Sequence, residues 1–159
     1  MRHPIRPCLA AALLLACGHA AAAGVQLVSP VPYAQNNRVT EAIKTECELG
    51  EQLAASVKAH ASVPVELVAQ APGAGRVLQL EIVDAVSMDN GFLKYTRIKG
   101  TLLEGGQKVA GFKGRRNSMG GAFGRFGGTC SILGRTVEAL GQDIGLWLDA
   151  PIDGAHIGG

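Results

Sequence analysis

Aromatic residues and charge are both scarce in this 159-residue chain: aromatics make up 4% of it and charged residues 18%. With a hydrophobic fraction of 47%, the chain is nevertheless too apolar and too weakly charged to be wholly disordered. Its 22 glycines have no three-residue period, which excludes a collagen-like chain. The length excludes a large multidomain enzyme, and we expect one small domain over residues 24–152.

Motifs that carry known chemistry are also missing. The sequence has no Gly-x-Ser-x-Gly, His-Glu-x-x-His or Cys-x-x-Cys pattern and no phosphate-binding loop. His60 and His156 have no nucleophile beside them and lack the spacing of zinc ligands. Glu81, Asp84 and Asp89 are expected at exposed strand ends. We therefore predict a protein that is not an enzyme and holds no metal or cofactor. The alternative is an enzyme whose site is assembled from dispersed residues.

The first 23 residues are predicted to be a secretory signal peptide. Two arginines precede a short apolar run from Cys8 to Cys17, and an alanine-rich Ala-x-Ala pattern ends at Ala23. The run is shorter than the about 20 residues that a spanning helix needs, and no later segment qualifies. Cleavage after Ala23 gives a periplasmic or secreted protein. In the alternative, Cys17 ends a lipoprotein signal, and acylated Cys17 tethers the protein to the outer membrane.

Charge is balanced overall and uneven along the chain. Without the signal peptide the protein has 13 basic and 13 acidic residues. Residues 24–91 carry four bases and eight acids, whereas residues 92–135 carry nine bases and one acid. The basic block consists of Lys94, Arg97, Lys99, Lys108, Lys113, Arg115, Arg116, Arg125 and Arg135. This block is either an anion-binding face or a set of strands that neutralises an acidic helix around residues 41–51. Export and the neutral total disfavour nucleic acid as a partner.

Hydrophobic periodicity predicts an α+β fold. Apolar residues recur at helical spacing in two long segments, and they alternate with polar residues in three consecutive shorter ones. The predicted elements are helices over 38–60 and 130–148, strands near 78–82, 95–103 and 109–115, and short extended segments over 25–28 and 63–68. We expect an antiparallel sheet of three to four strands with the two helices packed on one face. Residues 153–159 are expected to form a disordered tail.

Two cysteines remain after the signal peptide, Cys47 and Cys130, and each is predicted on or beside the apolar face of a helix. Export would place them in an oxidising compartment. If both helices lie on one face of the sheet, the two sulfurs can meet in a disulfide. Chain-entropy arguments give such a bond, across 83 residues, an upper value of about 4.5 kcal/mol. The alternative is a pair of buried free thiols.

A glycine-rich segment over residues 115–128 is the most distinctive part of the sequence. It leads into a helix N-terminus, where backbone amides favour anions. Its large basic and apolar residues are Arg115, Arg116, Phe123, Arg125 and Phe126. We predict that these residues bind a ligand or partner, such as an acidic lipid, a glycan or an envelope protein. The alternative is a flexible connector whose phenylalanines fold back onto the core.

The stretches FKGRRNSMGGAFGRFGG and GTCSILGRTVEALGQDIGLWLDAP resemble small, uncharacterised exported proteins of proteobacteria. The resembling positions are Gly120, Gly121, Phe123, Cys130, Ala139, Leu140, Asp143 and Trp147, with a weaker match at Glu46 and Cys47. The resemblance implies export and the framework of two cysteines, and it implies no activity. Together with the residue patterns it favours a non-catalytic binding or assembly module of the bacterial cell envelope. A secreted effector or inhibitor is the remaining alternative.

Overall fold

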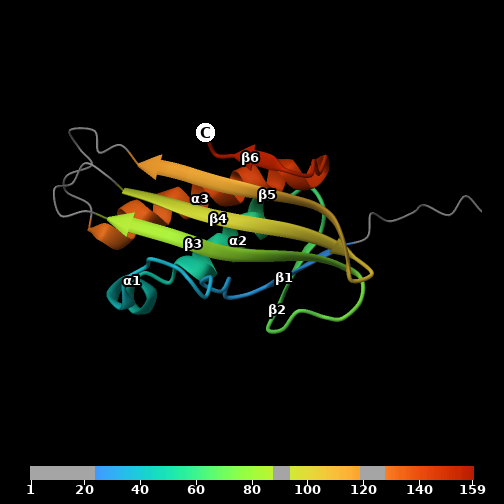
Figure 1. The fold of residues 1–159 in the computed structure, drawn as a ribbon, viewed down its shortest axis with the longest axis horizontal. Coiled ribbons are helices and arrows are strands. Elements are labelled where there is room, and N and C mark those ends of the chain that lie inside the picture. Colours follow the sequence, from blue (N-terminus) through green and yellow to red (C-terminus); the bar gives the residue numbers. More distant parts are fainter. Residues whose placement is uncertain (1–23, 88–93, 119–127) are drawn as a thin grey trace, which may run out of the picture.

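The computed structural model describes residues 24–87, 94–118 and 128–159, which form a six-stranded sheet and three helices. The strands are β1 (Val25–Val28), β2 (Val65–Val68), β3 (Arg76–Ser87), β4 (Lys94–Glu104), β5 (Gln107–Ser118) and β6 (Ala155–Ile157). The helices are α1 (Glu41–Glu46), α2 (Leu49–His60) and α3 (Thr129–Asp149). Figure 1 shows α2 and α3 behind the sheet, so one sheet face is covered and the other is open. Among the described residues, no helix is both long and apolar enough to cross a membrane.

The sheet has the strand order β2-β1-β3-β4-β5-β6 and mixes two kinds of pairing. β3, β4 and β5 form the predicted antiparallel meander. β1 runs parallel to both β2 and β3, and β6 runs parallel to β5. Parallel neighbours require a crossover connection. Here α1 and α2 connect β1 to β2, and α3 connects β5 to β6.

These pairings correct the predicted antiparallel sheet of three to four strands with two helices. That prediction was wrong because it did not assign the short segments on either side of the meander to strands of the same sheet. Residues 153–159, for which the sequence predicts a disordered tail, contain β6. Ala155 and Ile157 of this strand pack against the hydrophobic core. A strand of three residues is too short to show a two-residue alternation that sequence reasoning can recognise.

The meander follows from alternation along the strands. Leu78, Leu80 and Ile82 of β3 face the helices, and so do Ile98 and Leu102 of β4. Two consecutive glycines with positive φ, Gly105 at 57° and Gly106 at 82°, form the turn between β4 and β5. Such φ values cost glycine little, and the tight turn sets the register of β4 against β5.

The helix predicted over residues 38–60 is interrupted. α1 ends at Glu46, and Glu48 adopts a left-handed conformation with φ of 47° before α2 begins at Leu49. The interruption brings Gly50 against the backbone of Val31, where no side chain would fit. It also turns the chain at Cys47, next to the first turn of α3. The predicted Cys47–Cys130 disulfide is confirmed, with the two Cα atoms 4.8 Å apart.

Candidate functional site

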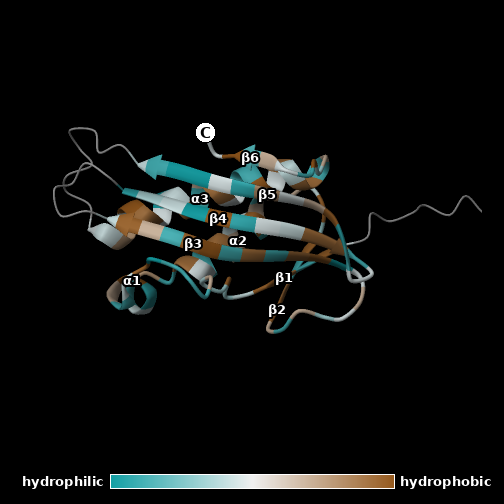
Figure 2. Ribbon diagram, viewed as in Figure 1, coloured by the Kyte–Doolittle hydropathy of each residue, from teal (hydrophilic) through white to brown (hydrophobic). Residues whose placement is uncertain are grey.

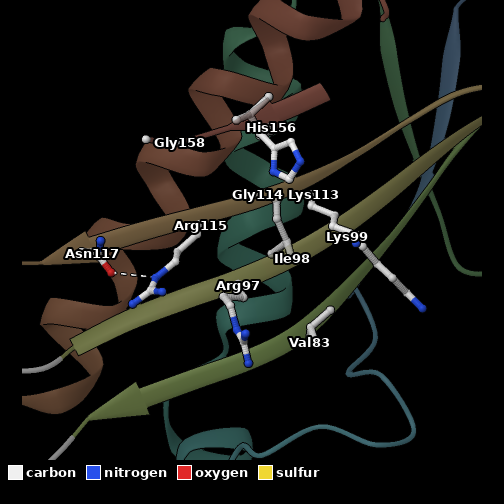
Figure 3. Close-up of a pocket in the computed structure, with 12 residues that line it drawn as sticks. Val83, Arg97, Ile98, Lys99, Lys113, Gly114, Arg115, Asn117, His156 and Gly158 are labelled. Atoms are coloured by element: carbon white, nitrogen blue, oxygen red, sulfur yellow. Dashed lines mark hydrogen bonds between the residues drawn. The ribbon is translucent and has the colours of Figure 1, made fainter. Parts of the chain in front are cut away.

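The open face of the sheet carries a groove of about 740 Å³ over β3, β4, β5 and β6. Figure 3 shows its basic side chains projecting from neighbouring strands, and Figure 2 shows that the second half of β5 is hydrophilic. The basic residues lining the groove are Arg97, Lys99, Lys113, Arg115 and His156. They reach this face because alternate residues of a strand point to opposite sides, and the intervening residues face α3.

Strand register arranges four of these cations in two rows. Lys99 of β4 lies directly opposite Lys113 of β5, and Arg97 lies directly opposite Arg115. His156 of β6 extends the lysine row, because it is the partner of Lys113. Like charges directly opposite each other destabilise an antiparallel pair. The face therefore concentrates positive charge at a cost to the isolated sheet.

A β-bulge on β3 supplies the carboxylate beneath the arginine row. Simple alternation from Leu80 and Ile82 would place Asp84 towards the helices. The register shifts between Ile82 and Asp84, so that Asp84 lies opposite Arg97 on the open side. The bulge gives β3 one extra residue and reverses its alternation. Ala85 takes the position that faces the helices instead, opposite Thr96.

Asp84 organises a small polar cluster. Its side chain is 0% exposed, and its Oδ2 accepts hydrogen bonds from Arg97 Nη2 at 2.6 Å and from Tyr95 Oη at 3.1 Å. The guanidinium carbons of Arg97 and Arg115 lie 5.7 and 4.5 Å from the centre of the Tyr95 ring. Burial and the hydrogen bond to Asp84 raise the pKa of Tyr95 above its usual 10.0, although the two arginines oppose this shift. Tyr95 therefore remains a neutral hydrogen-bond donor close to both cations.

The cations of the face are unequally compensated. Lys99 pairs with Glu81 at 2.7 Å, and Arg97 pairs with Asp84. In the described part of the chain, no carboxylate forms a salt bridge with Lys113 or Arg115. Arg115 Nε instead donates to the side-chain oxygen of Asn117 at 2.9 Å. Lys113 and Arg115, which are adjacent on the open face of β5, are thus available to bind an external anion.

The predicted binding residues are not all brought together. Arg115 lies in the groove, but it belongs to a strand rather than to a loop. Arg116 lies on the opposite sheet face, where its Nε and Nη2 donate to Asp143 of α3 at 2.8 and 2.7 Å. These hydrogen bonds raise the pKa of Arg116 and make it a structural residue. The other predicted residues, Phe123, Arg125 and Phe126, lie outside the described residues, as do Cys17 and the rest of the predicted signal peptide.

The alternative prediction, that the basic strands neutralise the acidic helix around residues 41–51, is not supported by any ion pair among the described residues. Of the ion pairs among the described residues, none joins a basic strand residue to residues 41–51. The basic strand residues pair with β3, β4, α3 and Asp153 instead. Arg97, Lys99 and Lys113 belong to the basic block in the sequence, but they are not among the predicted binding residues. The sequence does contain a signal for this site. Arg97 and Lys99 are two residues apart on one predicted strand, and Lys113 and Arg115 are two residues apart on the next, so all four are expected on one face of the sheet.

Comparisons with known proteins show distant structural similarity and no sequence relative. No protein-family model and no curated protein matches the sequence. Among solved structures, the chain is similar to the PelC L103M dodecamer from Paraburkholderia phytofirmans. The two share 16% sequence identity with a TM-score of 0.47, over 76% of this chain and 87% of that one. No family is assigned to the chain on this similarity.

Proposed function

We propose that the protein is a non-catalytic binding module of the bacterial cell envelope that binds an anionic ligand on the open face of its sheet. The observation that carries the proposal is the pair of like-charge rows, Arg97 with Arg115 and Lys99 with Lys113. In each row the β4 cation is balanced by a carboxylate of β3, whereas Lys113 and Arg115 of β5 form no salt bridge among the described residues. A bound anion would supply the missing counter-charge and relieve the repulsion within each row. The ligand surface thus moves from the predicted glycine-rich segment to the strands, and Arg115 belongs to both.

An envelope location agrees with the remaining features of the chain. The N-terminal 23 residues have the pattern of a signal peptide, and a disulfide such as Cys47–Cys130 persists in oxidising compartments. Cleavage after Ala23 would place β1 at the very start of the mature protein, whereas acylation of Cys17 would add a short tether before it. Mass spectrometry of the protein purified from its native host distinguishes the two by the mature N-terminus.

The binding proposal is tested by thermal unfolding with and without tripolyphosphate, at ionic strength matched with sodium chloride. Tripolyphosphate should raise the melting temperature of the wild type, because a ligand that binds only the folded state stabilises it. Lys113→Gln/Arg115→Gln should melt at the same temperature as the wild type or higher without ligand, since repulsion is relieved, and should lose the response to tripolyphosphate.

The matched control is Lys58→Gln/Arg135→Gln, which removes two exposed charges from the helices on the other face. It should retain the wild-type response. The proposal fails if both double variants lose the response equally, or if the wild type binds neither tripolyphosphate nor anionic vesicles nor an acidic oligosaccharide.

A further inference from the structure

We propose that the ligand of this face is a linear polysaccharide bearing carboxylates. This inference rests on the proposed function, and it names the ligand class from the types of cation, their spacing and the nature of the surrounding surface. A planar carboxylate matches a guanidinium fork, and a chain of acidic sugars presents several carboxylates in sequence.

The arginine row provides the fork. Arg97 is held by Asp84, and Arg115 is held by Asn117 through its Nε. With Nε committed, the two terminal nitrogens of Arg115 form the edge that binds a carboxylate in a bidentate manner. Both guanidinium groups also lie against the ring of Tyr95, and this contact restricts their orientation. Arginines that are oriented in advance lose less freedom on binding.

The lysine row provides a second anion site. Lys99 and Lys113 lie two residues along their strands from Arg97 and Arg115, which corresponds to about 7 Å. A ligand that satisfies both rows therefore carries at least two anionic groups at such a separation. Lysine ammonium groups can donate hydrogen bonds to an anion from many directions, so this row tolerates variation in the ligand geometry.

The surface between the charges suits sugar rings. The groove is open to solvent, and Val83, Gly114 and Gly158 contribute small or aliphatic surface to its lining. A hydrophilic chain can lie along such a surface without leaving water completely. Figure 3 shows the cations distributed around this lining rather than gathered at one point, which fits an extended ligand.

Other polyanions fit the described surface less well. The large exposed apolar residues, Val109, Leu146 and Ile152, do not line the groove, whereas an interfacial surface inserts apolar groups into the lipid. Single-stranded nucleic acids require aromatic rings on which bases stack. On this face, Tyr95 is flanked by two guanidinium groups and does not offer a free ring surface.

The test is isothermal titration calorimetry with short oligogalacturonate and with its fully methyl-esterified form, which removes charge and keeps the sugar chain. The acidic form should bind at least about tenfold more tightly, which corresponds to one or more lost charge-assisted contacts in the ester. Lys113→Gln/Arg115→Gln should weaken binding by about tenfold or more, whereas Lys58→Gln/Arg135→Gln should stay within about twofold.

Arg115→Lys tests the fork itself, because it keeps the charge and removes the bidentate geometry. It should weaken oligogalacturonate binding by several fold and leave tripolyphosphate binding nearly unchanged. Equal affinity of the wild type and Arg115→Lys for oligogalacturonate would overturn the role of the fork.

Binding to vesicles of phosphatidylglycerol separates two claims: that the face binds anions, and that its ligand is an acidic polysaccharide. If the face variants abolish binding to vesicles or to tripolyphosphate while oligogalacturonate does not bind at all, the polysaccharide is wrong and anion binding by the face still holds. If none of the three probes binds, both proposals fail together.

Discussion

Asp84 is the residue whose position depends most on its surroundings. It is fully buried, yet one of its two principal partners, Arg97, is 43% exposed at the side chain. The two ends of this ion pair therefore respond differently to mutation. An exposed guanidinium that loses its partner can be solvated by water, whereas a buried carboxylate that loses its partner has neither water nor another cation to stabilise its charge.

Arg97→Gln should therefore lower the free energy of unfolding by about 3 kcal/mol, because it leaves Asp84 buried with Tyr95 as its remaining hydrogen-bond donor. Urea denaturation measures the change. Lys99→Gln serves as the control, because its pair with Glu81 is exposed at both ends and should cost less than about 1 kcal/mol. Similar losses in the two variants would show that Arg97 does not hold a buried charge.

The two tyrosines of the chain should make the stability of the fold depend on pH in the alkaline range. Burial raises the pKa of Tyr33 above 10.0, and burial together with Asp84 raises that of Tyr95. Both phenols should ionise above pH 10.0 in the folded protein and close to pH 10.0 in the urea-unfolded protein, as measured by phenolate absorbance. Because the folded pKa values are raised, the stability that these groups contribute is complete below pH 10.0 and is lost as the pH rises through the folded values. A native midpoint at or below the denatured one would contradict the burial of both rings.

At the scale of elements, the contact between α2 and α3 depends on glycines of α3. A Cβ atom at Gly141 would collide with the side chain of Ser56 and lie 3.0 Å from its backbone carbon. At Gly134 the nearest atom is the end of the flexible Gln52 side chain, at 2.7 Å. The two positions therefore separate close helix packing from helix propensity.

Gly141→Ala should destabilise the protein by about 1–3 kcal/mol, because α2 has to move away from α3. Gly134→Ala should be neutral or stabilising by up to about 1 kcal/mol, since Gln52 can rotate and alanine favours a helix. Thermal unfolding of the two variants beside the wild type makes the comparison. Equal effects would mean that the helices do not pack as closely as their glycines indicate.

The disulfide joins the junction between α1 and α2 to the first turn of α3. Cys130→Ala should lower the free energy of unfolding under oxidising conditions by up to about 4.5 kcal/mol, because the unfolded chain loses its cross-link. With a reductant present, the wild type should fall to the level of the variant. Thermal unfolding in both conditions measures this, and a wild type that is insensitive to reductant would contradict it.

At the scale of the whole molecule, the end of the chain is part of the fold. Ala155 and Ile157 pack against the core, and Trp147 Nε1 donates to the carbonyl oxygen of Ile152 at 3.1 Å. Ending the chain at Pro151 should cost about 2 kcal/mol or more, since apolar surface of the core loses its cover. Ending it at Gly158 is the control and should change little. If both shortened chains unfold at the same urea concentration as the wild type, residues 153–159 behave as the disordered tail that the sequence predicts.

The sequence predicts those elements whose periodicity extends over many residues. Alternation at Leu78, Leu80 and Ile82 and the apolar stripe of α3 are long enough to be recognised, and the two helix faces led to the correct disulfide. β6 is too short for that, and the parallel pairing of β1 depends on contacts with segments about 40 and 50 residues later in the chain. Nothing local in Val25–Val28 encodes those partners.

The candidate site is predictable only in part, for two separate reasons. Arg115 and Arg116 look equivalent in the sequence, yet strand geometry sends them to opposite faces, and only the assignment of β5 through Ser118 separates them. Asp84 is displaced by a bulge, which depends on the pairing with β4 rather than on the alternation along β3. A residue that breaks the alternation of its own strand is therefore informative, because it marks where the register shifts.

The lengths of the outer strands have a consequence for the behaviour of the protein in concentrated solution. β2 has four residues and β6 has three, and they form the two ends of a sheet whose inner antiparallel strands have 11 or 12. Unpaired strand edges recruit other chains into fibrous aggregates, and short or charged edges resist this. Pro64 precedes β2, and Arg115 and Arg116 follow the part of β5 that β6 covers. The sheet is thus protected at both ends against growing by the addition of foreign strands, so the protein should remain dispersed at high concentration.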